Sequence, residues 1–300
     1  MKMTLQGIIC ALITPLTEQE KIDLRGVDQL LERVIGGGIN TLLALGSTGE
    51  QAMLRDAEKQ RMLQAVKSAL PAGVALIVGT GDTGTERAID NAKMAQDAGA
   101  DAVIVTPPSY YPFADGSLQE YYERIAEAIA LPVILYNISR FTGNKLSPEL
   151  VTKLSADQRI IGIKDSDRDM DYFRQLLKLT QAHKHFAVIQ GSDRLLVESF
   201  VAGSPAGVSV TANIYPELTV SLYEQCRRGD SVGAQTLQQR NLELVKVIIR
   251  HGCFPVELKT AAAGLGLCQA MASSPFPVLS EQDRQQLVHD VQKIIAGETV

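Results

Sequence analysis

The sequence predicts a (β/α)8 barrel, an α/β TIM-barrel fold, followed by a C-terminal helical extension. Eight short β-rich runs alternate with eight longer amphipathic segments over about 230 residues, close to the ~250 of a typical barrel. Several runs are apolar throughout, as expected for parallel strands buried on both faces. A doubly wound open sheet is the alternative, but the first run leads into Thr14-Pro15-Leu16 rather than a glycine-rich phosphate turn.

Each expected strand is followed by an expected helix. The apolar, β-rich runs predict strands at residues 7–13, 41–45, 74–79, 102–106, 133–136, 160–164, 186–190 and 206–210. Apolar residues at helical spacing predict the intervening helices at 24–35, 56–70, 85–97, 118–130, 148–154, 170–180, 194–201 and 216–227. The regular alternation is what favours a parallel barrel.

The strand signal stops after Arg228-Gly229-Asp230. Three further helices are expected at 231–249, 255–265 and 281–295, the last with Ser280 as its N-cap. We therefore divide the chain into a catalytic barrel domain at 1–228 and a C-terminal helical subdomain at 229–300. The extension covers the barrel or builds an oligomer interface, and the sequence leaves both possibilities open.

Composition excludes several classes of function. With 45% hydrophobic residues, 21% charged residues and a net charge of -5, the chain is typical of a soluble globular protein without a basic footprint for nucleic acid. Its apolar stretches are far shorter than the ~20 residues that span a bilayer. A local site can oppose the global sign, so anionic small substrates remain open. We expect a small-molecule substrate and no nucleic-acid or membrane partner.

The cysteines and histidines predict no metal site. Four scattered cysteines form no CxxC pair, and no HExxH motif occurs (Cys10, Cys226, Cys253, Cys268; His183, His185, His251, His289). His183 and His185 flank Lys184 in what is expected to be a loop before a strand, and a structural role is expected for each histidine. No signal peptide is recognisable, so we expect a cytoplasmic protein with reduced thiols.

Lys164 is the first candidate for chemistry. It ends the apolar run 160–163 and is followed at once by Asp165-Ser166. Burial at a strand end lowers the pKa of a lysine and frees its amine as a nucleophile, which can condense with a carbonyl to form a Schiff base. Taken alone, a lysine that snorkels to solvent or pairs with Asp165 is the alternative.

Other candidates also lie at strand ends, where barrels place their active sites. The turn Gly46-Ser47-Thr48-Gly49 offers N–H groups and two hydroxyls to a carboxylate, although it could simply cap a helix. Tyr136 ends the fifth strand and could shuttle protons beside Lys164, or be a core tyrosine. Together these groups supply the amine, proton shuttle and carboxylate clamp that a Schiff-base enzyme needs.

The chain resembles the dihydrodipicolinate synthase / N-acetylneuraminate lyase family (the DapA family) of pyruvate-dependent class I aldolases. The resemblance covers essentially the whole chain. It rests on five segments in order: Gly46-Ser47-Thr48-Gly49-Glu50, Val105-Thr106-Pro107, Leu135-Tyr136-Asn137-Ile138, Gly162-Ile163-Lys164-Asp165 and Gly207-Val208-Ser209-Val210-Thr211-Ala212-Asn213.

The resemblance implies a role for each catalytic candidate. Lys164 would form the Schiff base with pyruvate or a 2-keto acid, and Tyr136 would relay the proton. Ser47 and Thr48 would hold the pyruvate carboxylate and connect the relay. A tyrosine after the fourth strand, supplied by a neighbouring subunit, would complete the relay in a homotetramer built as a dimer of dimers. It is Tyr110 or Tyr111. No metal or organic cofactor is implied, because the imine is the electron sink.

Departures from the family pattern guide the choice of substrate. Synthases that use aspartate semialdehyde carry an arginine where this chain has Phe141, and Arg140, one residue early, is expected to point elsewhere. Arg194 replaces an acidic residue expected for sialic acid, and Ser209 replaces a glycine. We therefore expect a lyase that cleaves a 2-keto-3-deoxy sugar acid to pyruvate and an aldehyde.

Ser166, Gly191 and Asp193 match positions that bind sugar hydroxyls in lyases. The expected substrate-binding set is Gly46, Thr48, Ser166, Gly191, Asp193, Val208 and Ser209. The alternatives are a 4-hydroxy-tetrahydrodipicolinate synthase, an N-acetylneuraminate lyase and a dehydratase of deoxy-keto sugar acids. A non-catalytic keto-acid-binding protein is a further alternative, which the presence of both Lys164 and Tyr136 argues against.

Overall fold

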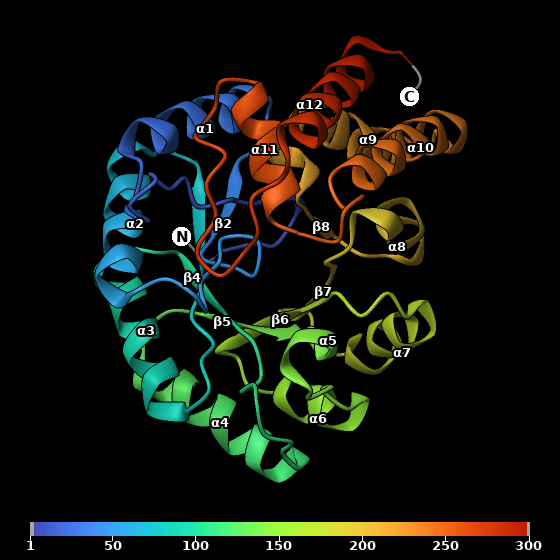
Figure 1. Ribbon diagram of the computed structural model, residues 1–300. Coiled ribbons are helices and arrows are strands. Elements are labelled where there is room, and N and C mark those ends of the chain that lie inside the picture. Colours follow the sequence, from blue (N-terminus) through green and yellow to red (C-terminus); the bar gives the residue numbers. More distant parts are fainter. Residues whose placement is uncertain (1–2, 299–300) are drawn as a thin grey trace.

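A computed structural model describes residues 3–298 of the chain. Within them, eight parallel strands pair in sequence order and the first also pairs with the eighth, which closes the barrel (Figure 1). The predicted (β/α)8 fold is therefore confirmed. The strands are β1 (Gly7–Ala11), β2 (Thr41–Ala44), β3 (Ala75–Gly79), β4 (Ala102–Val105), β5 (Val133–Asn137), β6 (Ile160–Asp165), β7 (Ala187–Gln190) and β8 (Ala206–Ser209).

Helices surround the strands and begin at recognisable caps. The Asp23, Ser147 and Asp169 side chains each accept a hydrogen bond from a first-turn N–H of the following helix. The helices of the barrel are α1 (Leu24–Gly36), α2 (Asp56–Ala69), α3 (Thr85–Asp97), α4 (Asp115–Ala128), α5 (Ser139–Thr142), α6 (Pro148–Leu154), α7 (Met170–Thr180), α8 (Leu196–Ala202) and α9 (Pro216–Arg228).

Two differences from the sequence prediction bear on the site. The single-turn helix α5 directly follows β5 and was not predicted, because four residues are too few for a periodic pattern. The helix expected at 194–201 starts instead at Leu196, since Asp193–Leu195 form a separate 3-10 turn. Both changes fall in loops at the carboxyl ends of the strands, where side-chain direction decides what enters the site.

Two apolar layers explain why the strands are hydrophobic on both faces. Ile9, Leu43, Ile77, Ile104 and Ile134 are buried in one cluster with Tyr136 and Ile189, which fills the barrel interior. A larger cluster lies between the strands and the surrounding helices. Ile163, the neighbour of Lys164 on β6, belongs to that outer layer. Because successive residues of a strand point to opposite faces, Lys164 faces the barrel interior.

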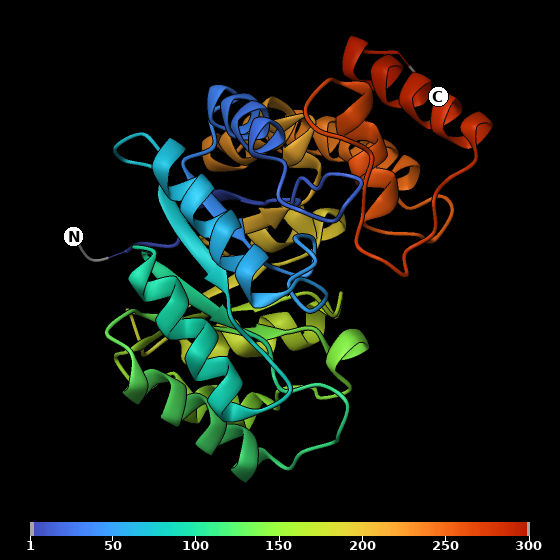
Figure 2. The same cartoon turned by 60° about the vertical axis from the view of Figure 1, so that its left-hand side comes forward.

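The C-terminal extension comprises α10 (Ser231–Val247), α11 (Val256–Gly264) and α12 (Glu281–Ala296). Ser280 caps α12 as predicted, accepting a hydrogen bond from the Asp283 N–H. Figures 1 and 2 show these helices packed beside α1 and α9, with the loop before α12 reaching over the end of the barrel. Leu244, Leu258 and Leu287 belong to the same buried cluster as the barrel. A domain boundary at residue 228 stays a prediction, and the hydrophobic core runs across it.

Within residues 3–298, none of the helices combines the length and apolar character needed to cross a membrane.

Candidate active site

Lys164 lies inside the barrel, one residue before the end of β6. Its side chain is 4% exposed and lines a cavity of about 330 Å³ at the carboxyl ends of the strands. It does not pair with Asp165, whose carboxylate accepts a hydrogen bond from Asn137 at 2.7 Å instead. Among the described residues, Lys164 has no ion-pair partner. The amine is therefore held inside a cavity, neither extended to solvent nor bound to a carboxylate.

Tyr136 stands directly beside Lys164. The two residues are register partners on β5 and β6, and the Lys164 ammonium lies 4.1 Å from the centroid of the Tyr136 ring. Burial by itself raises the pKa of Tyr136, but the Lys164 charge and the hydroxyls of Ser47 and Ser166 outweigh it and lower that pKa. A phenol with a lowered pKa is suited to give up and recover a proton.

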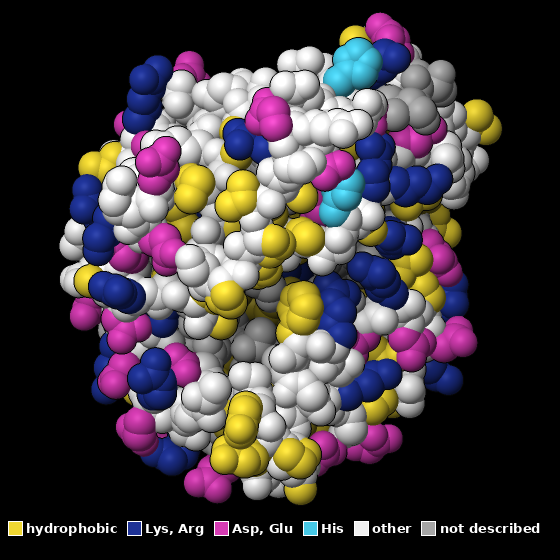
Figure 3. Space-filling model, viewed as in Figure 1, with side chains coloured by type: hydrophobic (Ala, Val, Ile, Leu, Met, Phe, Trp, Pro, Cys, Tyr) yellow, Lys and Arg dark blue, Asp and Glu magenta, His cyan; other side chains and the backbone are white. Residues whose placement is uncertain are grey.

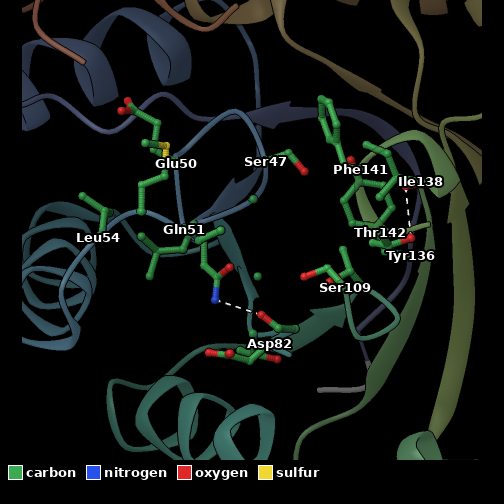
Figure 4. A pocket seen from close by; sticks show the side chains of 18 of the residues that line it. Ser47, Glu50, Gln51, Leu54, Asp82, Ser109, Tyr136, Ile138, Phe141 and Thr142 are labelled. Carbon is green, nitrogen blue, oxygen red and sulfur yellow. Dashed lines mark hydrogen bonds between the residues drawn. The ribbon is translucent and has the colours of Figure 1, made fainter. Parts of the chain in front are cut away.

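The turn after β2 forms the opposite wall of the cavity. Ser47 and Thr48 both line it, and Figure 4 shows the Ser47 side chain directed toward the space in front of Tyr136. Within residues 3–298, the backbone N–H groups of Ser47 and Thr48 donate to no protein acceptor. Two unused N–H groups beside two hydroxyls make a binding site for a carboxylate. Gly46 lies in the same turn but lines the adjoining cavity described below.

The turn is held in place by a buried charge pair that sequence reasoning missed. Glu50, with a left-handed φ of 58°, forms an ion pair with Lys259 of α11, and both side chains are fully buried. The second Glu50 oxygen accepts a hydrogen bond from the Ser273 N–H at 2.6 Å. Burial lowers the pKa of Lys259, while the Glu50 charge opposes that effect. A lysine in the mostly apolar segment 256–264, where Glu257 and Thr260 are the other polar residues, was the signal that could have revealed it.

Gly191 makes room for the lysine. A Cβ atom at this position would lie 2.8 Å from Lys164 Cε and 2.0 Å from Ser166 Oγ, and both distances are shorter than real contacts. Ser166 Oγ instead donates to the Gly191 carbonyl at 3.2 Å. Gly191, Ser166 and Val208 all line the cavity. The structure thus brings these three predicted residues together around Lys164.

Asp193 has contacts of a different kind from those expected. One carboxylate oxygen accepts hydrogen bonds from Ser209 Oγ at 2.5 Å and Thr211 Oγ1 at 3.0 Å, and the other accepts one from the Val210 N–H at 2.9 Å. Burial raises the pKa of Asp193, and these hydrogen bonds oppose that effect. Asn241 of α10 also donates to the Asp193 carbonyl at 3.2 Å.

These contacts favour a positioning role for Asp193 and Ser209. Both Asp193 oxygens are already engaged, and the Ser209 hydroxyl is turned toward Asp193 rather than toward the cavity. Together they tie the loop after β7 to the end of β8 and to α10. That either residue holds substrate hydroxyls stays a prediction.

Tyr110 and Tyr111 point away from the cavity of their own subunit. They are 84% and 65% exposed, pack edge to face with ring centroids 4.9 Å apart, and line neither cavity. Ser109, the residue before them, lines the adjoining cavity. Within one subunit, neither tyrosine contributes to the wall of the Lys164 cavity.

A second cavity of about 410 Å³ adjoins the first and shares Ser47, Tyr136 and Phe141 with it (Figure 4). Its far wall comes from the segments after β2 and β3, where Gln51 Nε2 donates to the Gly81 carbonyl at 3.0 Å. The C-terminal extension forms part of the wall of both cavities, since Phe254 lines each of them. Within residues 3–298, no group of three or more His, Cys, Asp or Glu side chains is arranged to hold a metal.

The prediction that Arg140 points elsewhere is wrong. Arg140 lines the Lys164 cavity, donates to the Ser166 carbonyl at 3.2 Å and stacks over the Phe141 ring at 4.8 Å. The reason is the unpredicted turn α5, which sets the direction of both side chains as soon as β5 ends. Arg168 and Arg194 line the same cavity. Arg194 was expected at a substrate position, in place of an acidic residue, whereas no role was expected for Arg168.

An amide side chain fixes the loops that carry Arg140 and Arg168. Asn137 Nδ2 donates to Asp165 at 2.7 Å and to Asp167 at 2.9 Å, and its oxygen accepts from the Leu146 N–H at 3.1 Å. Asp167 in turn accepts from the Ser139 N–H at 2.8 Å. Burial raises the pKa of Asp165 to about 6. The network is invisible in the sequence because it joins loops about 28 residues apart.

Comparison with known proteins identifies the family. The model of the dihydrodipicolinate synthetase family matches residues 4–294. This chain belongs to that family. It is 30% identical to a 4-hydroxy-tetrahydrodipicolinate synthase of Methanopyrus kandleri, with 98% of each chain covered. The family consists of class I enzymes that work through a lysine Schiff base, so this protein is a pyruvate-dependent aldolase or lyase of that class.

Solved structures of the family superpose closely on the chain. The Escherichia coli K12 prophage protein YagE, in complex with pyruvate, has a TM-score of 0.92 at 30% identity, covering 97% of this chain and 98% of its own. The chloride-inhibited dihydrodipicolinate synthase of Acinetobacter baumannii, also complexed with pyruvate, has a TM-score of 0.92 at 31% identity, covering 98% and 99%.

Proposed function

We propose that the protein cleaves a 2-keto-3-deoxy sugar acid to pyruvate and an aldehyde, with Lys164 as the Schiff-base residue. The observation that carries the proposal is the placement of the Lys164 ammonium 4.1 Å from the Tyr136 ring, in a cavity whose other wall is the Ser47–Thr48 turn. Relatives of this family have been solved with pyruvate bound, which supports pyruvate as the shared product.

The chemistry follows from these positions. Ser47 and Thr48 bind the substrate carboxylate, which places the keto carbon at Lys164 Nζ. The amine adds to that carbon and water leaves, giving an imine. Tyr136 then accepts the proton of the C4 hydroxyl as the C3–C4 bond breaks, so the aldehyde departs and an enamine remains. Proton return to C3 and addition of water release pyruvate and restore the amine.

A 4-hydroxy-tetrahydrodipicolinate synthase is the second candidate. The name of the Methanopyrus kandleri relative favours it, and so does the presence of Arg140 in the cavity, where a carboxylate of aspartate semialdehyde could bind. Phe141, which lines both cavities in place of the arginine of such synthases, argues against it. An N-acetylneuraminate lyase and a sugar-acid dehydratase would use the same imine and belong in the same assay panel.

We also propose a homotetramer that resides in the cytoplasm. Support for assembly comes from the exposed pair Tyr110 and Tyr111, which line neither cavity beside Lys164 and leave an aromatic surface open to a neighbouring subunit. The four cysteines are free thiols, as a reducing compartment would keep them. Sedimentation of the wild type and of Tyr110→Ser/Tyr111→Ser tests the assembly.

Borohydride trapping tests the core of the proposal. Treatment with pyruvate and borohydride should add one reduced pyruvate to Lys164, detected by peptide mass spectrometry, and should inactivate the enzyme. Lys164→Arg should show neither effect, whereas the exposed-lysine control Lys145→Arg should behave as wild type. An unmodified Lys164 in active wild-type enzyme would contradict the proposal.

The substrate is then decided by comparing rates. Pyruvate release from a panel of 2-keto-3-deoxy sugar acids and from N-acetylneuraminate is measured beside condensation of pyruvate with aspartate semialdehyde. Loss of water without pyruvate release would indicate the dehydratase. A kcat/KM for aspartate semialdehyde that exceeds every sugar-acid value would establish the synthase instead.

A further inference from the structure

Three arginines lie on one side of the Lys164 cavity. Arg140, Arg168 and Arg194 follow three neighbouring strands, three residues beyond Asn137 of β5, three beyond Asp165 of β6 and four beyond Gln190 of β7. All three line the cavity that contains Lys164. The similar offsets bring three guanidinium groups to the mouth of one site, and nothing in the proposed cleavage of a sugar acid at Lys164 uses them.

The cluster has no internal counter-charge. Among residues 3–298, no carboxylate forms an ion pair with any of the three arginines. Asp193 is the one acidic side chain that lines this cavity in the described part of the chain, and its oxygens are already occupied. Partial burial of the guanidinium, together with the charges of Arg140 and Arg194, lowers the pKa of Arg168. The three cations therefore repel one another in the absence of an anion.

The positive side of the cavity stands out against the whole molecule. The chain has a net charge of -5, yet Figure 3 shows basic side chains gathered beside the hollow near the centre of this face. Guanidinium groups bind carboxylates and phosphates through paired N–H donors. Arg140 uses one nitrogen for the Ser166 carbonyl, and that single bond fixes the side chain while leaving further N–H groups available.

The position of the cluster specifies which end of a substrate it meets. β2 and β6 lie four strands apart in the closed ring of eight, so the Ser47–Thr48 turn and Lys164 face each other across the barrel. A 2-keto acid that lies along this cavity, with its carboxylate on the turn and its C2 at Lys164, directs its remaining carbons toward the Lys164 side, where the loops after β5, β6 and β7 form the wall. Those are the loops that carry the arginines.

We propose that Arg140, Arg168 and Arg194 bind a second anionic group at the far end of the substrate. The enzyme then acts on 2-keto acids, or joins pyruvate to aldehydes, that end in a carboxylate or a phosphate. This inference rests on the proposed function, because it takes Lys164 as the anchor of the keto carbon. It adds the substrate class: a dianion rather than a sugar acid with an uncharged hydroxymethyl end.

Imine trapping with matched keto acids tests the inference without knowledge of the natural substrate. The concentration that gives half-maximal borohydride inactivation is measured for straight-chain 2-oxo acids of five to seven carbons. Each length is compared as a monoacid and as the dioic acid, and a third member ends in a phosphate monoester. For at least one length, an anionic end should lower that concentration about tenfold or more, the range of charge-assisted hydrogen bonds.

Arginine variants assign the preference to the cluster. Arg168→Gln and Arg194→Gln should reduce the preference for the anionic end severalfold each, and the double variant should remove most of it, because Arg140 alone remains. Trapping by pyruvate itself should stay within twofold of wild type. Arg227→Gln, an exposed arginine on α9, is the matched control and should leave the preference intact. Raising the ionic strength should weaken the preference in wild type and in Arg227→Gln, and should have little effect in the double variant, because exposed charges are screened.

The outcomes separate the two proposals. If pyruvate fails to trap Lys164, the proposed function is wrong. If pyruvate traps Lys164 normally but no chain length favours an anionic end, or the double variant keeps the preference, the arginine cluster is not the distal anion site. A preference for phosphate over carboxylate, or the reverse, identifies which anion the substrate carries.

Discussion

Charged side chains at the two ends of the Lys164 cavity differ in burial and in pairing. At the β2 end, Glu50 and Lys259 are fully buried, paired with each other and fixed by the Ser273 N–H. At the end formed by the loops after β5, β6 and β7, Arg140, Arg168 and Arg194 are exposed and have no acidic partner among the described residues.

This difference indicates that the charges at the β2 end support the structure of the turn, whereas those at the other end are available to bind substrate. A buried pair is expensive to break, so it holds the Ser47–Thr48 turn in one position for a carboxylate that every substrate of the reaction shares. Unpaired exposed cations cost little and can be changed singly, so they suit the part of the substrate that varies. Variants at the rigid end and at the open end should therefore differ in their effects on catalysis and stability.

Removing the Tyr136 hydroxyl should have the largest effect on catalysis, because Tyr136 lies between the two ends of the cavity, beside Lys164. Tyr136→Phe should lower kcat by about a hundred- to ten-thousandfold, since a proton relay is lost beside Lys164. Stability should change little. Steady-state kinetics of pyruvate release and denaturant unfolding provide the two measurements. A kcat within threefold of wild type would show that another group carries the proton.

Breaking the buried pair should affect stability most. Lys259→Met leaves the Glu50 carboxylate buried without its cation and should lower the free energy of unfolding by about 3–5 kcal/mol. Glu50→Gln/Lys259→Met should recover at least half of that loss. The exposed pair of Arg174 and Glu198 is the control, and Arg174→Gln should cost less than about 1 kcal/mol. Equal losses for Lys259→Met and Arg174→Gln would refute the contrast.

The loops at the open end should respond to pH through Asp165. Burial raises the pKa of Asp165 from 3.8 to about 6, so its stabilising protonated form is complete below pH 4 and is lost as the pH rises through about 6. That fall amounts to about 2–3 kcal/mol. Asp165→Asn should remove this fall from the curve of unfolding free energy against pH. The side-chain oxygen of the new asparagine can still accept the hydrogen bond from Asn137. A variant curve parallel to wild type from pH 4 to 7 would contradict this assignment.

Neutralising an arginine of the open end should have the smallest effect on stability. Arg168→Gln removes an unpaired exposed cation that the charges of Arg140 and Arg194 disfavour. The free energy of unfolding should therefore change by no more than about 0.5 kcal/mol, or rise slightly. Chemical denaturation of the variant beside Lys259→Met provides the comparison. A loss above 2 kcal/mol would mean that Arg168 supports the loop rather than a ligand.

Sequence alone predicted the barrel because its signals are local. Each buried strand is a short apolar run, each helix has its own period, and the alternation of the two leaves few topologies. The placement of Lys164 and Tyr136 at neighbouring strand ends followed from that topology, and their register pairing agrees with it. Caps such as Ser280 were equally readable, since they depend on contacts within one turn.

The tertiary structure decided what those side chains face. Glu50 and Lys259 come from the barrel and from α11, and only packing joins them across more than 200 residues. The sequence predicts that Asp193 binds a sugar hydroxyl, yet both of its carboxylate oxygens accept hydrogen bonds within the protein, from Ser209 and Val210. The direction of the Arg140 side chain was predicted wrongly because it lies on the helical turn α5, which the sequence did not predict. Local sequence fixes where a residue lies along a strand, whereas burial and charge balance depend on contacts that only the closed barrel creates.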